Sequence, residues 1–174
     1  IWGPMNRFEL FDFNASTGVV SNAIQFPPST FADGPYGVEF SPDGTKMYGS
    51  TNHTNNIYQF DLCAGSNAAI ANSGVLIGTS SSDFIGSLQL GPDKKIYVAR
   101  YGATWIGVIN NPNTLGAGCN YVDNGVSLAG KFSSLGIPNF VSLKQLPPPF
   151  AVSYACLTGS FTEPTVTITT CSGT

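Results

Sequence analysis

Few residues in this sequence have the type and spacing that catalysis requires. The single histidine, His53, lies in the polar stretch 52–56, and any Ser–His–Asp arrangement would have to use it. An isolated histidine in a polar loop is more often a solvated residue than a catalytic base, and no Gly-x-Ser-x-Gly nucleophile motif is present. The sequence therefore predicts that the chain is not an enzyme and that it uses no cofactor.

Metal ligands are equally scarce in the sequence. One histidine and the absence of a Cys-x-x-Cys pair cannot supply the usual ligands of a zinc site, and no EF-hand loop is present. Asp33 and Asp83 stand before equivalent strands of two repeats, so they are candidates for a calcium or sugar site on one face. Capping of turns explains the two aspartates as well, and we predict no metal site.

A repeat of about 49–50 residues must position any site, because it spans most of the chain. Residues 37–48 return as 86–97, and 136–140 open a third copy. A second mark, an apolar strand that ends in a polar residue, keeps a spacing of 49 residues at Asp12, Asp61 and Asn110. Two independent marks with one period indicate repeated structural units.

Each complete repeat contains four short strand-like runs separated by turn residues. We expect strands near 36–41, 46–51, 55–62 and 73–79 in one copy, and near 85–90, 95–100, 104–110 and 119–127 in the next. Four strands in 40–50 residues are typical of a β-propeller blade. The fold class expected is all-β, with propeller blades that form an incomplete ring. A β-sandwich with accidental internal similarity is the alternative.

The composition changes at a proline-rich stretch near the C-terminus. We expect the C-terminal blades of a partial propeller over 1–146, a linker over 147–150, and the truncated start of an Ig- or PKD-like β-sandwich module over 151–174. The propeller blades not contained in 1–146 are expected to precede Ile1.

The charge and hydropathy patterns exclude two classes of partner. Only 10% of the residues are charged, and seven scattered basic residues against ten acidic ones provide no basic patch for nucleic acid. No apolar run approaches the length of a membrane-spanning helix. We therefore predict no nucleic-acid partner and no membrane span in this chain.

The loops that join the expected strands contain the better candidates for binding. In a propeller, loops 51–55, 100–104, 27–35, 78–84 and 127–135 open on one face. Arg100 and Tyr101, with Trp105 nearby, suit recognition of a protein or a carbohydrate. Packing of Tyr101 and Trp105 between blades is the competing interpretation. The candidate ligand-binding residues are His53, Arg100, Tyr101, Trp105, Asp33 and Asp83.

The four cysteines are an even number, which suits two disulfides in an exported protein. Cys156 and Cys171 flank a short strand pair, and we predict a bond between them. Cys63 follows the expected third strand of one repeat and Cys119 lies near the expected fourth strand of the next, and we predict a second bond there, with free buried thiols as the alternative.

A set of short sequence motifs, in a fixed order, resembles those of a known protein family. Over roughly residues 30–143 the sequence resembles the propeller region of large gliding-motility-associated surface proteins of Bacteroidota. The motifs that carry the resemblance are 35–44, 56–62, 88–99, 108–113 and 119–121. Proteins of this family look like type IX secretion cargo, with PKD-like repeats and a C-terminal sorting domain.

The resemblance implies a function and a location. We expect a non-enzymatic, extracellular or cell-surface module of a large adhesin, which acts as a rigid binding or spacer platform. Its expected partners are a surface polysaccharide or protein and, during export, the type IX secretion machinery. The alternative is a propeller enzyme, a lactonase or a glycan-cleaving enzyme, with catalytic residues outside this chain. The ligand and the total number of blades stay open.

Overall fold

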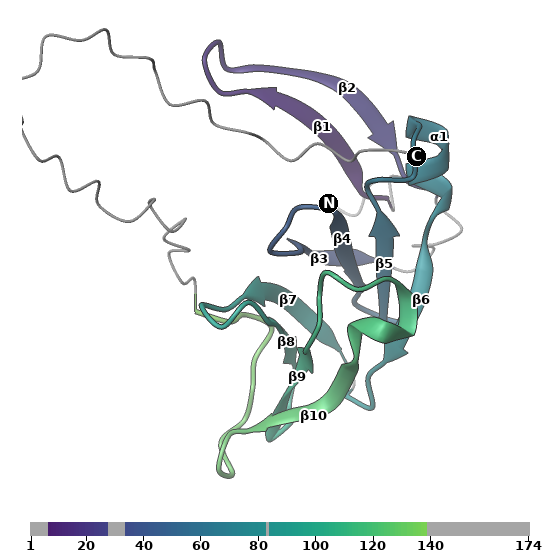
Figure 1. The fold of residues 1–174 in the computed structure, drawn as a ribbon. Coiled ribbons are helices and arrows are strands. Elements are labelled where there is room, and N and C mark those ends of the chain that lie inside the picture. Colours follow the sequence, from purple (N-terminus) through teal and green to yellow (C-terminus); the bar gives the residue numbers. More distant parts are fainter. Residues whose placement is uncertain (1–6, 28–33, 83, 139–174) are drawn as a thin grey trace, which may run out of the picture.

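The computed structural model describes residues 7–27, 34–82 and 84–138, and within them the chain is all-β apart from two short helical turns (Figure 1). The strands are β1 (Glu9–Asn14), β2 (Val19–Gln25), β3 (Pro35–Phe40), β4 (Lys46–Thr51), β5 (Asn56–Asp61), β6 (Val75–Thr79), β7 (Ile85–Leu90), β8 (Ile96–Arg100), β9 (Trp105–Ile109) and β10 (Tyr121–Ser127). Helix α1 (Asn67–Asn72) precedes β6, and the 3-10 turn η1 (Gly116–Cys119) precedes β10. The predicted linker 147–150 and β module 151–174 lie outside the described residues.

The strands form several antiparallel sheets, which confirms the all-β prediction at this level. β1 and β2 form a hairpin, whereas β3–β4–β5–β6 and β7–β8–β9–β10 are four-stranded sheets whose strands follow chain order. The eight strands predicted for the two complete repeats match the observed strands to within a few residues. Turn chemistry accounts for much of this agreement, because the first two strands of each sheet, and the second and third, are separated by residues suited to tight reversals.

The turns between the first two strands of each sheet illustrate the rule. In the first sheet, Gly44 has φ of 72° and its N–H donates to the Ser41 carbonyl at 2.9 Å. The Asp43 carboxylate accepts from the Thr45 N–H at 3.0 Å. In the second sheet, Lys94 occupies the left-handed region with φ of 64°, where a side chain is disfavoured. The second turn is thus a more strained version of the first.

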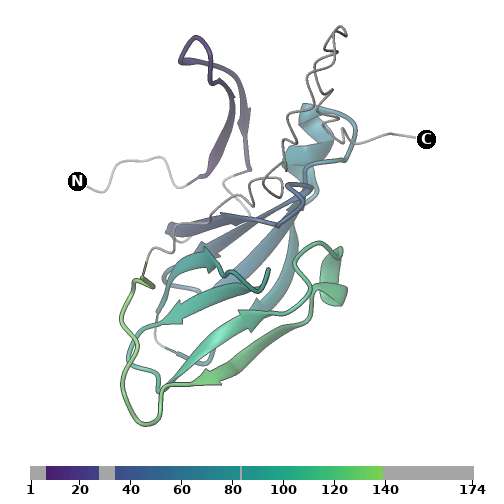
Figure 2. The same cartoon turned by 60° about the vertical axis from the view of Figure 1, so that its left-hand side comes forward.

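The two four-stranded sheets stack face to face, as Figure 2 shows, and the main core lies between them. Tyr48 and Ile57 project from the first sheet against Leu88, Val98 and Ile109 of the second, and all five side chains are buried. Because their burial removes a large apolar area from water, this interface is the main source of stability for the pair of sheets.

A buried polar network ties the loop after β9 to the first sheet. The Gln59 amide donates to the Tyr48 hydroxyl at 2.6 Å and to the Thr114 carbonyl at 2.7 Å, and the Gly116 N–H donates to the Gln59 carbonyl oxygen at 2.7 Å. The Tyr48 hydroxyl donates in turn to the Pro112 carbonyl at 2.7 Å. The two hydrogen bonds of the Tyr48 hydroxyl are buried and the other two are partly buried, so the network fixes the loop against the sheet.

Glycines allow the first strands of the two sheets to approach closely. A Cβ at Gly37 of β3 would lie 2.7 Å from the Gly86 carbonyl oxygen of β7. The Ser50 hydroxyl bridges the same place, because it accepts from the Gly37 N–H at 2.9 Å and donates to the Gly86 carbonyl at 3.0 Å. The Glu39 carboxylate also accepts from the Leu90 N–H at 2.8 Å, so β3 and β7 are held together along their length.

The β1–β2 hairpin covers part of the other face of the first sheet. Phe26, after β2, packs on Met47 and Phe60 in a second core cluster, and the Phe26 and Phe60 rings lie 4.5 Å apart. Helix α1 lies beside β2 and β5 (Figure 1). The helix begins at Ser66, whose hydroxyl accepts from the Ala69 N–H at 3.2 Å. The hairpin therefore contacts the first sheet at its base, through Phe26 and the partly buried Phe8 and Leu10, while most residues of its strands are exposed.

Equivalent positions of the two sheets point toward the unit that precedes each sheet in the chain. Leu88, Ile96 and Ile109 of the second sheet face the first sheet, and their equivalents one repeat earlier are Val38, Met47 and Phe60, on the face toward the hairpin. Met47 and Phe60 are covered, but Val38 is 46% exposed. The neighbouring residues Tyr36 and Phe40 are exposed as well, which leaves an apolar strip along β3.

The third copy begins beside β7. The Ser87 N–H donates to the Leu135 carbonyl at 2.8 Å, and the Ile137 N–H donates to the Ser87 hydroxyl at 3.1 Å. Gly86 approaches the Leu135 backbone even more closely than Gly37 approaches Gly86. The segment around 135–137 thus lies against β7 as β7 lies against β3, although the third copy from residue 139 onward lies outside the described residues.

The structure corrects one predicted disulfide. Cys119 is a free thiol, fully buried in the core between the two sheets, and Cys63 is disulfide-bonded elsewhere. The predicted Cys63–Cys119 bond is therefore wrong. Cys119 points into the core from η1, whereas Cys63 lies in the turn after β5, so their places in adjacent repeats do not bring the two side chains together. The predicted Cys156–Cys171 pair lies outside the described residues.

Candidate binding face

Four loops gather at the end of the sheets where β4, β6 and β8 finish. The Asn55 side-chain amide donates to the Ser82 carbonyl at 2.6 Å, which joins the β4–β5 turn to the β6–β7 connection. The Tyr101 N–H donates to the Phe84 carbonyl at 3.0 Å, and the Gly102 N–H to the Ser133 carbonyl at 3.0 Å. Backbone hydrogen bonds therefore hold these loops as one surface, here named the loop face.

A row of rings crosses the loop face. His53 and Tyr101, both predicted as binding residues, contact Phe84 from the loops on either side of it. Their ring centroids lie 6.0 Å and 6.1 Å from that of Phe84, in edge-to-face arrangements. Tyr101 is 49% exposed. Phe84 and Tyr101 line an apolar hollow of about 310 Å³ with Asn52 and Leu135. The rings of this row are available for contact from solvent.

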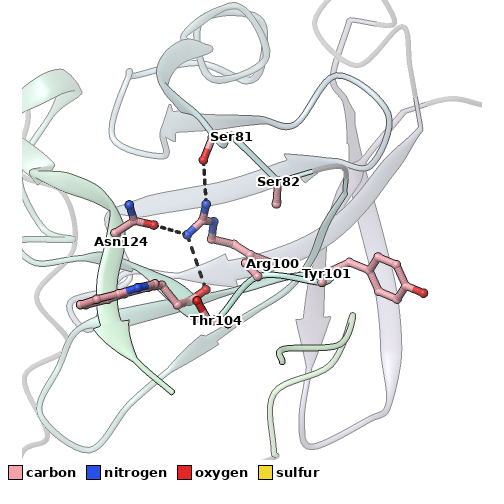
Figure 3. A pocket seen from close by; sticks show the side chains of 9 residues that line it. Ser81, Ser82, Arg100, Tyr101, Thr104 and Asn124 are labelled. Atoms are coloured by element: carbon pink, nitrogen blue, oxygen red, sulfur yellow. Dashed lines mark hydrogen bonds between the residues drawn. The ribbon is translucent and has the colours of Figure 1, made fainter. Parts of the chain in front are cut away.

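A second, polar hollow lies on the other side of the Tyr101 backbone. It has a volume of about 390 Å³, and its lining includes Ser81, Ser82, Arg100, Thr104, Trp105 and Asn124. In Figure 3, Arg100 points toward Ser81 and Asn124, and the Tyr101 side chain points in the opposite direction. The loop face therefore carries two hollows of different character, separated by the 101–104 turn.

Arg100 is buried beneath the polar hollow and is fully engaged by the protein. Its Nε donates to the Ser80 hydroxyl at 2.8 Å, and one terminal nitrogen donates to the Asp123 carbonyl and the Asn124 side-chain oxygen at 2.8 Å and 2.7 Å. The other terminal nitrogen donates to the Ser81 hydroxyl at 2.9 Å and pairs with the Asp123 carboxylate at 2.8 Å. All five N–H groups have acceptors, so none is left for a ligand.

Asp123 completes this cluster from β10. Its carboxylate also accepts from the Ser81 N–H at 3.0 Å and the Tyr121 hydroxyl at 2.7 Å. Partial burial raises the pKa of Asp123, but these hydrogen bonds outweigh the effect and hold the pKa below its usual value. Burial and the neighbouring carboxylate raise the pKa of Tyr121. Asp123 is therefore ionised at neutral pH and neutralises the Arg100 charge.

The structure separates the predicted binding residues into three groups. His53 and Tyr101 share the aromatic row, while Arg100 and Trp105 belong to the polar hollow. Trp105 is 39% exposed, so neither it nor Tyr101 is packed fully between the sheets. Arg100 has the structural role of joining the β6–β7 connection to β10. Asp33 and Asp83 lie outside the described residues.

Sequence reasoning missed several residues of the loop face, among them Phe84, Thr104 and Asn124. Phe84 and Thr104 lie within loops expected on this face, but nothing in their type singled them out. Asn124 lies inside strand β10, and its place beside Arg100 depends on the pairing of β10 with β9. That pairing has a shifted register between Val122 and Val126, which sequence alternation does not reveal.

The described part of the chain contains neither a cluster of metal ligands nor a membrane-spanning helix. Among residues 7–27, 34–82 and 84–138, no group of three or more His, Cys, Asp or Glu side chains lies close enough to hold a metal ion. No helix in the same residues has the length and apolar character needed to span a membrane.

Comparison with protein-family models and with curated proteins gives no match. Among solved structures, the chain is similar to a luciferin-regenerating enzyme, with a TM-score of 0.42 and 17% sequence identity. The alignment covers 74% of this chain and 36% of that one, so this chain spans about a third of its length. At that TM-score the similarity assigns neither a fold nor an activity to this chain.

Proposed function

We propose that the chain is a non-enzymatic module of a large exported protein, an adhesin or gliding-associated protein of the cell surface, in which it serves as a binding platform. The surface location and export through the type IX machinery rest on the sequence resemblance. The observation that carries the binding role is the loop face, where exposed rings and two hollows lie on loops fixed by hydrogen bonds. Binding residues on loops of a rigid scaffold are a common arrangement for recognition.

The two four-stranded sheets are proposed to be consecutive propeller blades. Three features support this arrangement: the order of the sheets along the chain, the close approach of β3 to β7, and the contact of the segment 135–137 with β7. The β1–β2 hairpin corresponds to the outer half of a preceding blade. The exposed strip of Tyr36, Val38 and Phe40 is where the inner strands of that blade would pack.

The binding role is tested with a variant of the aromatic row. A chain carrying Phe84→Ala and Tyr101→Ala is compared with the unchanged chain for binding to surface polysaccharide and surface protein purified from a gliding bacterium, by biolayer interferometry. We expect the double variant to lose binding. Leu115→Ala is the matched control, because Leu115 is 55% exposed but lies in the loop at the opposite end of β9. Binding that the double variant retains in full would exclude the loop face.

Location and architecture are tested on the protein from its source. Antibody labelling of intact cells is expected to reach the protein, and its denatured mass is expected to be well above the 18.3 kDa of this chain. Labelling that requires cell lysis would contradict a surface role. A source protein of about 18.3 kDa would contradict the propeller, because a closed ring needs about four blades or more.

A further inference from the structure

The size, the charge and the polar groups of the polar hollow, together with the aromatic surface beside it, select a class of ligand. This inference rests on the proposed binding role of the loop face. The hollow has a volume of about 390 Å³. Pockets that hold small ligands have volumes of roughly 300–1,000 Å³. Its size therefore suits a small molecule or a short stretch of a polymer.

The hollow is electrically neutral. Arg100 is the one charged side chain among the described residues that line it, and the carboxylate of Asp123 compensates its charge at 2.8 Å. Because all five N–H groups of Arg100 are already bound to protein acceptors, the guanidinium offers neither free charge nor free donors to a phosphate, sulfate or carboxylate. The Arg100 guanidinium would therefore add nothing to the binding affinity of an anionic ligand.

The hollow presents polar groups that the protein does not use. Asn124 directs its side-chain oxygen to Arg100, and among the described residues its NH₂ group has no acceptor. The Thr104 hydroxyl has no hydrogen-bond partner among the described residues either. An amide donor and a hydroxyl that both donates and accepts match the alternating donors and acceptors of a hydroxyl-rich molecule.

Aromatic surface lies next to these polar groups. Trp105 lines the polar hollow and is 39% exposed, and beyond the 101–104 turn Tyr101 and Phe84 line the apolar hollow. Aromatic rings provide apolar contact area for the C–H faces of a sugar ring, while their polar tips stay in water. We infer that the polar hollow binds a neutral oligosaccharide through Asn124, Thr104 and Trp105, and that the sugar chain continues across the turn onto Tyr101.

The test compares neutral with acidic sugars and long chains with short ones. Cellohexaose, mannohexaose and xylohexaose are titrated against the full chain by isothermal calorimetry, beside glucose and a galacturonate hexamer. At least one neutral hexasaccharide is expected to bind more tightly than glucose and than the acidic hexamer. Preference for the galacturonate hexamer, or no binding of any neutral hexasaccharide at millimolar concentration, would overturn the inference.

Two conservative variants place the sugar in the hollow. Asn124→Asp keeps the oxygen that Arg100 uses but replaces the free NH₂ donor, and Thr104→Val keeps the shape but removes the hydroxyl. Each is expected to weaken binding of the hexasaccharide about fivefold to tenfold, the effect of losing one hydrogen bond. Asn67→Asp on α1 is the control for the first variant, because it makes the same chemical change on an exposed residue away from the loop face.

The outcomes also separate this inference from the proposed function. If both variants bind the hexasaccharide as tightly as the unchanged chain, the polar hollow is not the sugar site, whatever the role of the aromatic row. If no sugar binds but the chain binds a surface protein through Phe84 and Tyr101, the ligand class inferred here is wrong and the binding role stands.

Discussion

Replacement of Arg100 by methionine tests whether the buried guanidinium holds the two sheets together at the loop face. Methionine keeps a long unbranched stem but supplies none of the five donors, so the Ser80 and Ser81 hydroxyls lose a partner and Asp123 loses its cation. Breaking a buried ion pair by removing one partner costs about 3–5 kcal/mol. Because the Asp123 side chain is 23% exposed, water can solvate its carboxylate, and we expect a loss of about 2–3 kcal/mol.

The assay is urea unfolding at pH 7, followed by circular dichroism and by tryptophan fluorescence. Lys131→Met is the matched control, because it removes an exposed cation near the same loops, and such surface changes alter stability by about 0.5 kcal/mol or less. A loss below about 1 kcal/mol for Arg100→Met would refute the reasoning, since it would mean that the hydrogen bonds around Arg100 contribute no more than exposed ones. Combining Arg100→Met with Ser81→Ala should give less than the sum of the single effects, because the two residues share a hydrogen bond.

Three further predictions follow from the fold. Folding lowers the pKa of Asp123, so the stability that its carboxylate contributes is present above its unfolded pKa and is lost as the pH falls through its folded pKa. In acid titrations of urea stability, Asp123→Asn should therefore lose less stability than the unchanged chain between about pH 5 and pH 2. Gly37→Ala should destabilise by about 1–3 kcal/mol in urea unfolding, because its Cβ would meet the Gly86 carbonyl, and a stability equal to that of the unchanged chain would contradict the close approach of β3 and β7. Lys94→Gly should stabilise by about 0.5–1 kcal/mol, since it removes a side chain from a left-handed position that Gly44 occupies in the first sheet, and a lower melting temperature would argue against strain at this turn.

Strand positions were predictable because they depend on local chemistry. Alternation of apolar residues and turn residues such as Pro42, Asp43 and Gly44 act within a few positions, and the 49-residue spacing repeats the signal in a second copy. Helix α1 escaped the prediction because its six residues contain no apolar period, and its start depends on the Ser66 cap. Local signals thus account for the sheets and for the connections between their strands.

The site was less predictable because its members meet only through packing. The surface position expected for Arg100 is contradicted by its burial, which depends on Ser80 after β6 and on Asp123 and Asn124 of β10, two other places in the chain. The Cys63–Cys119 pairing failed for the same reason, because distance along the repeat does not give the direction of a side chain. Residue type located the loop face, but the partners of each residue required the structure.

The unlike faces of each sheet have a consequence for how such a chain can lengthen. A sheet contacts the layer before it through one set of positions and the layer after it through another, and Gly37 and Gly86 lie on the first strands of successive units, where each unit approaches the next most closely. A duplication that joins two copies at these glycines would preserve both contact surfaces, because every new sheet would meet its neighbours in the correct orientation. A duplication of half a unit would instead add two of the four strands, and the new half-sheet would lack part of each contact surface. Growth by gene duplication is therefore expected to add whole units of about 49 residues, and insertions of other lengths are expected in the loops.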